Sequence, residues 1–290
     1  MSIPLPALLL IVACGLGWAG FDLMRKMLVR EIPPVALVFL LTLGSVPLFG
    51  AWMVEQRAGG PGAGYWLPAL VSVSLNVVAY LLFLGSMRIA PLSMTIPLLS
   101  LTPVFATLIS VPLLGERPSP SQAAGILLVV AGALGLHGWR RSSGPPGAAK
   151  GALMMALTAL LWSLTISCDK LGVERSSEPF HGFVLSAGVA AGVLLVLVIQ
   201  GRSGDLARVR QVPGLFVFAL AISTLALGFQ LLALPRVPVS TVETLKRGIG
   251  SFMALLSGGF VFHEPVTVRK VAAVGVMVVG VGLLLTDFGF

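Results

Sequence analysis

Charged residues are scarce in this chain. Asp, Glu, Lys and Arg make up 10% of its 290 residues, whereas a soluble domain carries roughly 25%. Hydrophobic residues reach 57%, and the mean hydropathy is +1.00. A helix needs about 20 predominantly apolar residues to cross the hydrocarbon core of a bilayer, and the sequence supplies one such run after another. The shortage of charge therefore excludes a soluble domain and predicts an integral membrane protein.

The sequence also has few of the residue patterns that form catalytic and metal-binding sites. The two cysteines, Cys14 and Cys168, lie inside apolar runs, so we interpret them as small hydrophobic residues and not as a disulfide or metal pair. The sequence has no H-E-x-x-H motif, no P-loop and no set of nucleophile and base. We therefore expect no enzyme activity, no catalytic residues, no cofactor and no metal site.

The net charge of +8 does not come from a basic patch. The Lys and Arg residues are scattered over the expected helix ends and short loops, without interleaved aromatic residues. This distribution argues against nucleic acid as a partner. No positively charged segment precedes the first apolar run, so we expect no cleaved signal peptide.

The chain contains an internal repeat. The stretches 88–116 and 236–264 align without a gap, and both begin with Arg and end with Glu. Upstream, 18–26 and 162–170 both read W-x7-K. One unit of about half the 290 residues is thus used twice. Many membrane transporters consist of two related halves that enclose a binding site at their interface.

The apolar runs predict ten membrane-spanning helices. Their ranges are 5–24, 35–54, 66–86, 92–114, 121–139, 151–171, 180–200, 212–233, 240–262 and 266–286. Five spans in each half is an odd number, so the second half must be inverted relative to the first. The expected fold is an all-α membrane protein of two inverted five-helix repeats, 1–139 and 151–290, joined by the linker 140–150.

Glycines in the apolar runs favour close helix packing. Gly15, Gly17 and Gly20 match G-x-G-x-x-G, but a dinucleotide site requires a preceding strand, and this run follows none. Small residues at such spacing let membrane helices approach closely. Gly188 and Gly192 have the same interpretation.

The strongest functional signal is a group of ionisable residues in span 240–262. Glu243, Lys246 and Arg247 stand at i, i+3 and i+4, so they share one helical face. Charged groups at membrane depth almost always face the bundle interior or a wet cavity. We favour a site for an anion or zwitterion, with Arg247 as a bidentate donor. The alternatives are a structural ion pair, or a later helix start that lets these residues snorkel.

The aligned first-half positions, Thr95, Leu98 and Leu99, carry no charge, so we expect the charge of the cavity to come from one half. Polar residues in other apolar spans are candidates for the same cavity: Asn76, Tyr80 and Gln230. Each is equally compatible with a hydrogen bond between helices.

The two W-x7-K segments are candidates for the ends of a transport pathway. We assign gating roles to Trp18, Lys26, Trp162 and Lys170, because inverted halves place the two lysines at opposite membrane faces. The alternative for each lysine is snorkelling to the interface.

Two further sets of residues are expected to have no part in transport. Glu116 and Glu264 precede helices, so we expect each carboxylate to favour the N-terminus of the helix that follows it. His137, His181 and His263 lie at span ends or in loops, where we expect solvated side chains.

These motifs resemble a known family. WAGFDLMRK and WSLTISCDK near the start of each half, and LLGE and VFHE before each last span, resemble the two EamA-type domains of the drug/metabolite transporter superfamily. The resemblance implies ten helices, a central cavity, alternating access and cytoplasmic termini. The basic residues of the loops favour the opposite orientation. Lys246 and Arg247 are similar to the Lys-Arg pair by which triose-phosphate translocators hold phosphate, which does not assign a sugar phosphate here.

The sequence therefore predicts a multi-pass secondary transporter of the cell (inner) membrane. It would move a small organic metabolite, anionic or zwitterionic, by alternating access. The expected partners are that solute, with or without a coupling ion, and the lipid bilayer; the chain would be a monomer or homodimer. The alternative is a non-transporting membrane scaffold or a lipid-handling protein.

Overall fold

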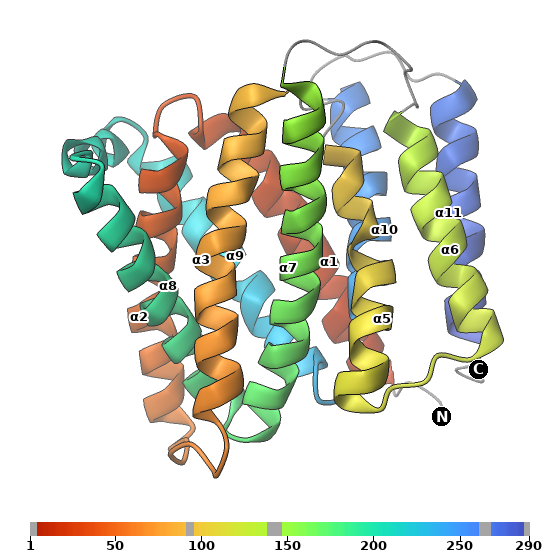
Figure 1. Cartoon of the computed structure of the whole chain (residues 1–290), viewed down its shortest axis with the longest axis horizontal. Coiled ribbons are helices and arrows are strands. Elements are labelled where there is room, and N and C mark those ends of the chain that lie inside the picture. The colour runs from red at the N-terminus through yellow and green to blue at the C-terminus, as the bar shows by residue number, and fades with distance from the viewer. Residues whose placement is uncertain (1–4, 91–95, 138–146, 261–267, 287–290) are drawn as a thin grey trace.

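The computed structural model describes residues 5–90, 96–137, 147–260 and 268–286. This part of the chain is a bundle of long helices that run side by side (Figure 1). In chain order they are α1 (Leu5–Leu28), α2 (Pro34–Glu55), α3 (Trp66–Ile89), η1 (Ile96–Leu101), α5 (Thr102–Leu114), α6 (Pro120–His137), α7 (Ala148–Glu174), α8 (Glu178–Ile199), η2 (Ser203–Gln211), α9 (Pro213–Ala233), α10 (Val239–Phe260) and α11 (Val268–Thr286).

Each predicted span overlaps one of these helices, with ends shifted by a few residues. The span expected at 92–114 differs most, because its described part starts with the 3-10 helix η1 and becomes α-helical at Thr102, next to Pro103. Proline has no backbone N–H, so it fits the first turn of a helix but not its interior. The short helix η2 lies in a segment that the sequence analysis left as a loop.

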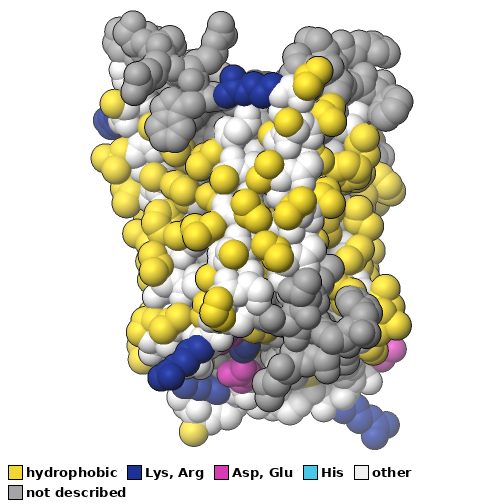
Figure 2. Space-filling view, turned by 90° about the vertical axis from the view of Figure 1, so that its right-hand side faces the viewer, with side chains coloured by type: hydrophobic (Ala, Val, Ile, Leu, Met, Phe, Trp, Pro, Cys, Tyr) yellow, Lys and Arg dark blue, Asp and Glu magenta, His cyan; other side chains and the backbone are white. Residues whose placement is uncertain are grey.

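Six helices in the described residues are long and apolar enough to cross a membrane by themselves: α1, α2, α3, α7, α8 and α9. Their outward faces carry exposed apolar side chains, among them Leu195, Val198 and Ile199 on α8. Figure 2 shows hydrophobic side chains covering the middle of one face, with charged ones near the ends. This pattern suits a lipid environment, and the chain is a multi-pass membrane protein.

The helix contacts are related by exchange of the two halves. Helix α3 packs along α7 as α9 packs along α1, and α5 contacts α7 as α10 contacts α1. The pairs α2 with α8 and α6 with α11 each join equivalent helices. Helices α1 and α7 run in opposite directions through the bundle (Figure 1). The described helices are thus arranged as an inverted pair of related units.

The glycine interpretation is confirmed by the packing. A Cβ on Gly17 would lie 2.9 Å from the Cβ of Ala226 on α9, and Gly15 faces Ile249 on α10 with similarly little space. Gly188 meets Val73 on α3 in the same way. These glycines bring helices from the two halves close together around the centre of the bundle.

Candidate functional site

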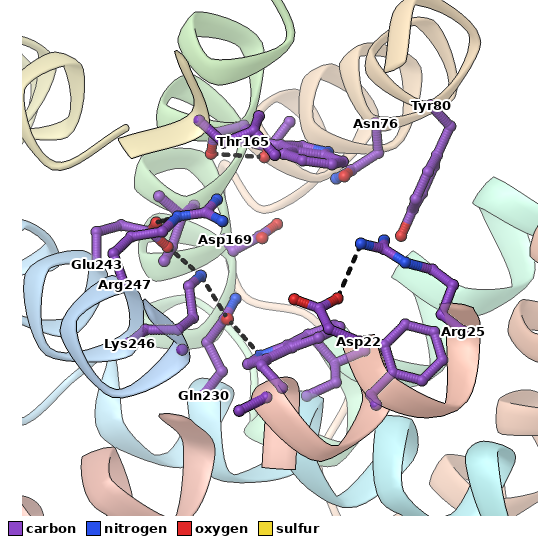
Figure 3. A pocket seen from close by; sticks show the side chains of 18 of the residues that line it. Asp22, Arg25, Asn76, Tyr80, Thr165, Asp169, Gln230, Glu243, Lys246 and Arg247 are labelled. Atoms are coloured by element: carbon purple, nitrogen blue, oxygen red, sulfur yellow. Dashed lines mark hydrogen bonds and ion pairs between the residues drawn. The ribbon is translucent and has the colours of Figure 1, made fainter. Parts of the chain in front are cut away.

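A cavity of about 290 Å³ lies between the two halves. It is lined by residues from α1, α3, α7, α9 and α10, among others, and by all six side chains that the sequence proposed for substrate binding: Asn76, Tyr80, Gln230, Glu243, Lys246 and Arg247. Trp18 and Trp162 line it as well. Figure 3 shows these polar groups converging on one space from different helices. Their role in binding stays a prediction.

The charged group on α10 is anchored at the centre of the bundle. The Glu243 side chain is 2% exposed and accepts a hydrogen bond from Lys246 Nζ. Lys246 also donates to Gln230 Oε1 at 3.2 Å, and the same oxygen accepts from Trp18 Nε1 at 3.1 Å. Gln230 therefore links α1, α9 and α10. Helix α10 begins at Val239, one turn before Glu243, so a later helix start is excluded.

Arg247 is held less completely than Lys246. Its Nε lies 3.8 Å from Glu243 Oε2, which is too long for a hydrogen bond. Both atoms are buried, and neither has a hydrogen-bond partner among the described residues. Nη2 makes one long contact, 3.4 Å, with Thr102 Oγ1. Because Arg247 lines the cavity and makes only this one long hydrogen bond among the described residues, its terminal N–H groups are available for an anionic group there.

Three charged residues that were not predicted from the sequence also line the cavity: Asp22, Arg25 and Asp169. Asp22 Oδ1 lies 2.8 Å from Arg25 Nη2, and the guanidinium stacks 5.0 Å from the Phe83 ring centre. The expectation that the charge comes from one half is therefore wrong. Arg25 and Asp169 lie directly before the lysines of the two W-x7-K segments, and Asp22 lies in the middle of the first.

A usable signal was present in the repeat. Arg25 and Asp169 stand at the same position of the two W-x7-K segments, one before each lysine. Together with α10, these residues give the cavity three carboxylates and three cations. A cavity with both signs of charge suits a solute that carries both signs.

An ion pair between the halves lies at the end of the bundle that holds both termini. Lys170 Nζ lies 2.7 Å from Glu116 Oε1 and donates to Val237 O at 3.0 Å. Glu116 also accepts from the Val239 N–H at 2.9 Å. The expectation for Glu116 is therefore wrong: it satisfies the N-terminus of α10 and not that of α6, because the fold places α10 nearer.

The opposite end of the bundle has Lys26 near the last turn of α1. Glu264, the repeat partner of Glu116, lies outside the described residues. The gating roles of Trp18, Lys26, Trp162 and Lys170 stay a prediction.

The expectation for His181 is wrong. Its side chain is fully buried, with Nε2 at 3.1 Å from Asp169 Oδ1 and Nδ1 at 3.2 Å from the Tyr65 hydroxyl. The first turn of α8 is packed against α7 here, so it is not at the surface. Burial raises the pKa of the Tyr65 hydroxyl, and the negative charge of Asp169 adds to the shift. The His137 side chain and His263 lie outside the described residues.

Comparisons with known proteins identify a family whose sequence model matches most of the chain. The sequence model of the EamA-like transporter family matches residues 5–137 and 149–286. No curated protein matches the chain. A solved structure described as "Crystal structure of protein" is 20% identical, has a TM-score of 0.78, and the match covers 96% of each chain. At this identity the likeness shows a shared fold alone.

Proposed function

The chain belongs to the EamA-like transporter family, a family of membrane transporters, and we propose that it is a secondary transporter of a small zwitterionic metabolite. A purely anionic solute is the second choice within the same proposal. The observation that carries it is the Arg247 guanidinium, which lines the cavity and makes only one long hydrogen bond among the described residues, to Thr102 Oγ1. A bidentate arginine fork matches a carboxylate or phosphate.

The distribution of charge favours a zwitterion over an anion. Lys246 is neutralised by Glu243, so Arg247 is the cation with donors to spare. Asp22 lines another part of the cavity, its side chain is 55% exposed, and it is paired with Arg25 on one side. A solute with an anionic end at Arg247 and a cationic end at Asp22 would have an oppositely charged partner for each of its own charges. A cavity of about 290 Å³ lies at the small end of ligand pockets, roughly 300–1,000 Å³.

The proposed mechanism is alternating access in a bundle of ten crossing helices, built from the inverted halves 1–139 and 151–290 of a cell (inner) membrane protein. The Lys170–Glu116 pair supports a closed pathway at the end with the termini, because it joins α7 to the N-terminus of α10. Since α10 carries Arg247 about two turns on, movement at this end reaches the binding residues directly. Release of the pair would open this end.

A ligand-stabilisation experiment tests the proposal. The purified protein is melted with amino acids, with the amines that lack their carboxylate, and with the acids that lack their amine. Ligand at 100 times its Kd adds about 2.7 kcal/mol to the free energy of unfolding. We expect the zwitterions to stabilise most and the amines least, and we expect Arg247→Gln to remove the effect. Stabilisation by lipids alone would favour the lipid-handling alternative instead. A hit is then tested for counterflow in proteoliposomes.

A further inference from the structure

A chain of hydrogen bonds runs from the central cavity to the end of the bundle with the termini. It begins at Asp169, which lines the cavity, and passes through His181 to Tyr65, just before α3. Asp169 Oδ1 also accepts from the Ser72 hydroxyl. Tyr65, Ser72 and His181 are fully buried, and Asp169 is 3% exposed. The residues come from α7, α8 and the start of α3, so the tertiary structure alone brings them together.

The fold leaves space for the imidazole at this place. Gly172 on α7 faces the His181 ring so closely that a Cβ there would overlap it. The first half has no equivalent pair, because the positions aligned with Asp169 and His181 hold Arg25 and Leu37. A guanidinium does not release its proton in proteins. The arrangement is therefore specific to one half of an otherwise repeated structure.

The chain of bonds suits both protonation states of the imidazole. When His181 is neutral, Tyr65 donates to Nδ1 and Nε2–H donates to Asp169. When His181 is charged, both nitrogens donate, the Tyr65 oxygen accepts, and Asp169 holds the opposite charge. Both ring nitrogens of His181 keep a partner in either state. In the charged state the buried Tyr65 O–H loses its acceptor, and the attraction between the imidazolium and Asp169 offsets that cost.

We infer that the His181–Asp169 pair is the proton-binding site of a proton-coupled transporter, an inference that rests on the proposed function. Asp169 gives the site access to the cavity. The next residue, Lys170, holds the ion pair with Glu116. A change of charge at His181 therefore acts beside the contact that closes this end. Proton binding and opening of the pathway are coupled through α7.

Other ionisable groups on the surrounding elements contribute to the electrostatic environment of this site. They are Tyr65 before α3, Lys170 on α7, Glu178 on α8, Asp22 and Arg25 on α1, and Glu243, Lys246 and Arg247 on α10. Helix α2 presents the uncharged Phe49, which packs at Gly182. Among these types of side chain, only imidazole ordinarily changes its charge between about pH 5 and 8.

The test follows the accessibility of one cavity position as a function of pH. Ser251, which lines the cavity, is changed to Cys in a background with Cys14→Ala and Cys168→Ala, and the protein is reconstituted in oriented liposomes. A membrane-impermeant thiol reagent is added from one side or the other between about pH 5 and 8. We expect the side from which the thiol reacts to shift with pH. His181→Gln and Asp169→Asn should abolish this shift, while Glu178→Gln, in the same turn of α8, should keep it.

Three results would overturn the inference, and they separate it from the proposed function. If the thiol reacts from either side with no dependence on pH, alternating access stands and proton coupling fails. If the shift persists in folded His181→Gln protein, the pair is only structural. If the thiol reacts from one side under every condition, alternating access fails and proton coupling with it. Should His181→Gln not fold, Tyr65→Phe decides: a moved midpoint supports the site, and an unchanged midpoint overturns it.

Discussion

Lys170 Nζ lies 2.7 Å from Glu116 Oε1 and joins the second half of the chain to the first. Both side chains are largely shielded from solvent, and the carboxylate also holds the first backbone N–H of α10. One carboxylate therefore connects a candidate gate to the helix that carries the central charges. Removing one partner of such a shielded pair destabilises the closed form, because the other charge is left without a partner.

Removing either partner should open this end of the pathway. We expect Lys170→Gln and Glu116→Gln to raise the reaction rate of Ser251→Cys from the side of the termini. A lost hydrogen bond to a charged group is worth about 1.5–3 kcal/mol, or roughly 10- to 150-fold in the equilibrium between closed and open forms. Arg236→Gln is the matched control, because its pair with Glu178 lies in the same region but is exposed. Equal rates in all variants would make Lys170 an interfacial anchor.

Arg247 should decide the affinity for the anionic end of the solute. We expect Arg247→Lys to weaken binding, because a bidentate fork is exchanged for a point charge. Arg247→Gln should weaken it further, by about 1.5–3 kcal/mol. Ligand-dependent melting measures both, with the exposed Arg210→Gln on η2 as the control.

Glu243→Gln and Lys246→Gln separate a binding site from a structural ion pair. If Glu243, Lys246 and Arg247 only stabilise each other, each Gln variant should lose folded protein, because a buried charge is left unpaired. A binding site predicts that the two cation variants fold and lose ligand stabilisation, while Glu243→Gln keeps binding or changes its pH dependence. Folded cation variants with undiminished affinity would refute the site.

Gly172→Ala should damage the site around His181. The added Cβ would overlap the imidazole, and overpacking of a buried site costs typically about 1–3 kcal/mol. We expect a lower melting temperature than for Gly275→Ala on α11, where no atom lies within 4 Å of the added Cβ. That control should be neutral or slightly stabilising, since Ala is the better helix former.

The buried Tyr65 hydroxyl should make the protein sensitive to alkali. Burial and the charge of Asp169 raise its pKa in the folded state, while the unfolded chain keeps an ordinary pKa of about 10. Above that pH the unfolded chain binds fewer protons than the folded one, so the free energy of unfolding falls as pH rises. Below it the contribution is constant. Melting between about pH 8 and 11 should show a smaller fall for Tyr65→Phe.

The proposed ten crossings predict that both termini lie on the same side of the membrane, and the start of α1 and the end of α11 lie at the same end of the bundle in Figure 1. Reporter fusions at each terminus, assayed for cytoplasmic or external activity, measure this directly. Termini on opposite sides would require an odd number of crossings and would contradict the inverted arrangement. The same assay decides between the orientation that the family resemblance implies and the one that the loop charges favour.

The sequence by itself determined the membrane class, the positions of the helices and the face shared by Glu243, Lys246 and Arg247. These features depend on composition and on the 3.6-residue period, which are local. The family resemblance could also be recognised from the sequence, because the same motifs recur at the same spacing in both halves and so identify a repeated unit.

Only the tertiary structure decided which polar residues meet. Asp22, Arg25 and Asp169 sit near helix ends, and a local pattern does not tell whether such an end faces lipid, water or a cavity. The prediction of a solvated His181 was wrong for the same reason. Its burial depends on the packing of α8 against Gly172 of α7. Glu116 finds its partners far along the chain, at Lys170 and Val239. Charges in an apolar bundle pair with whatever the fold brings near, and sequence distance does not set that choice.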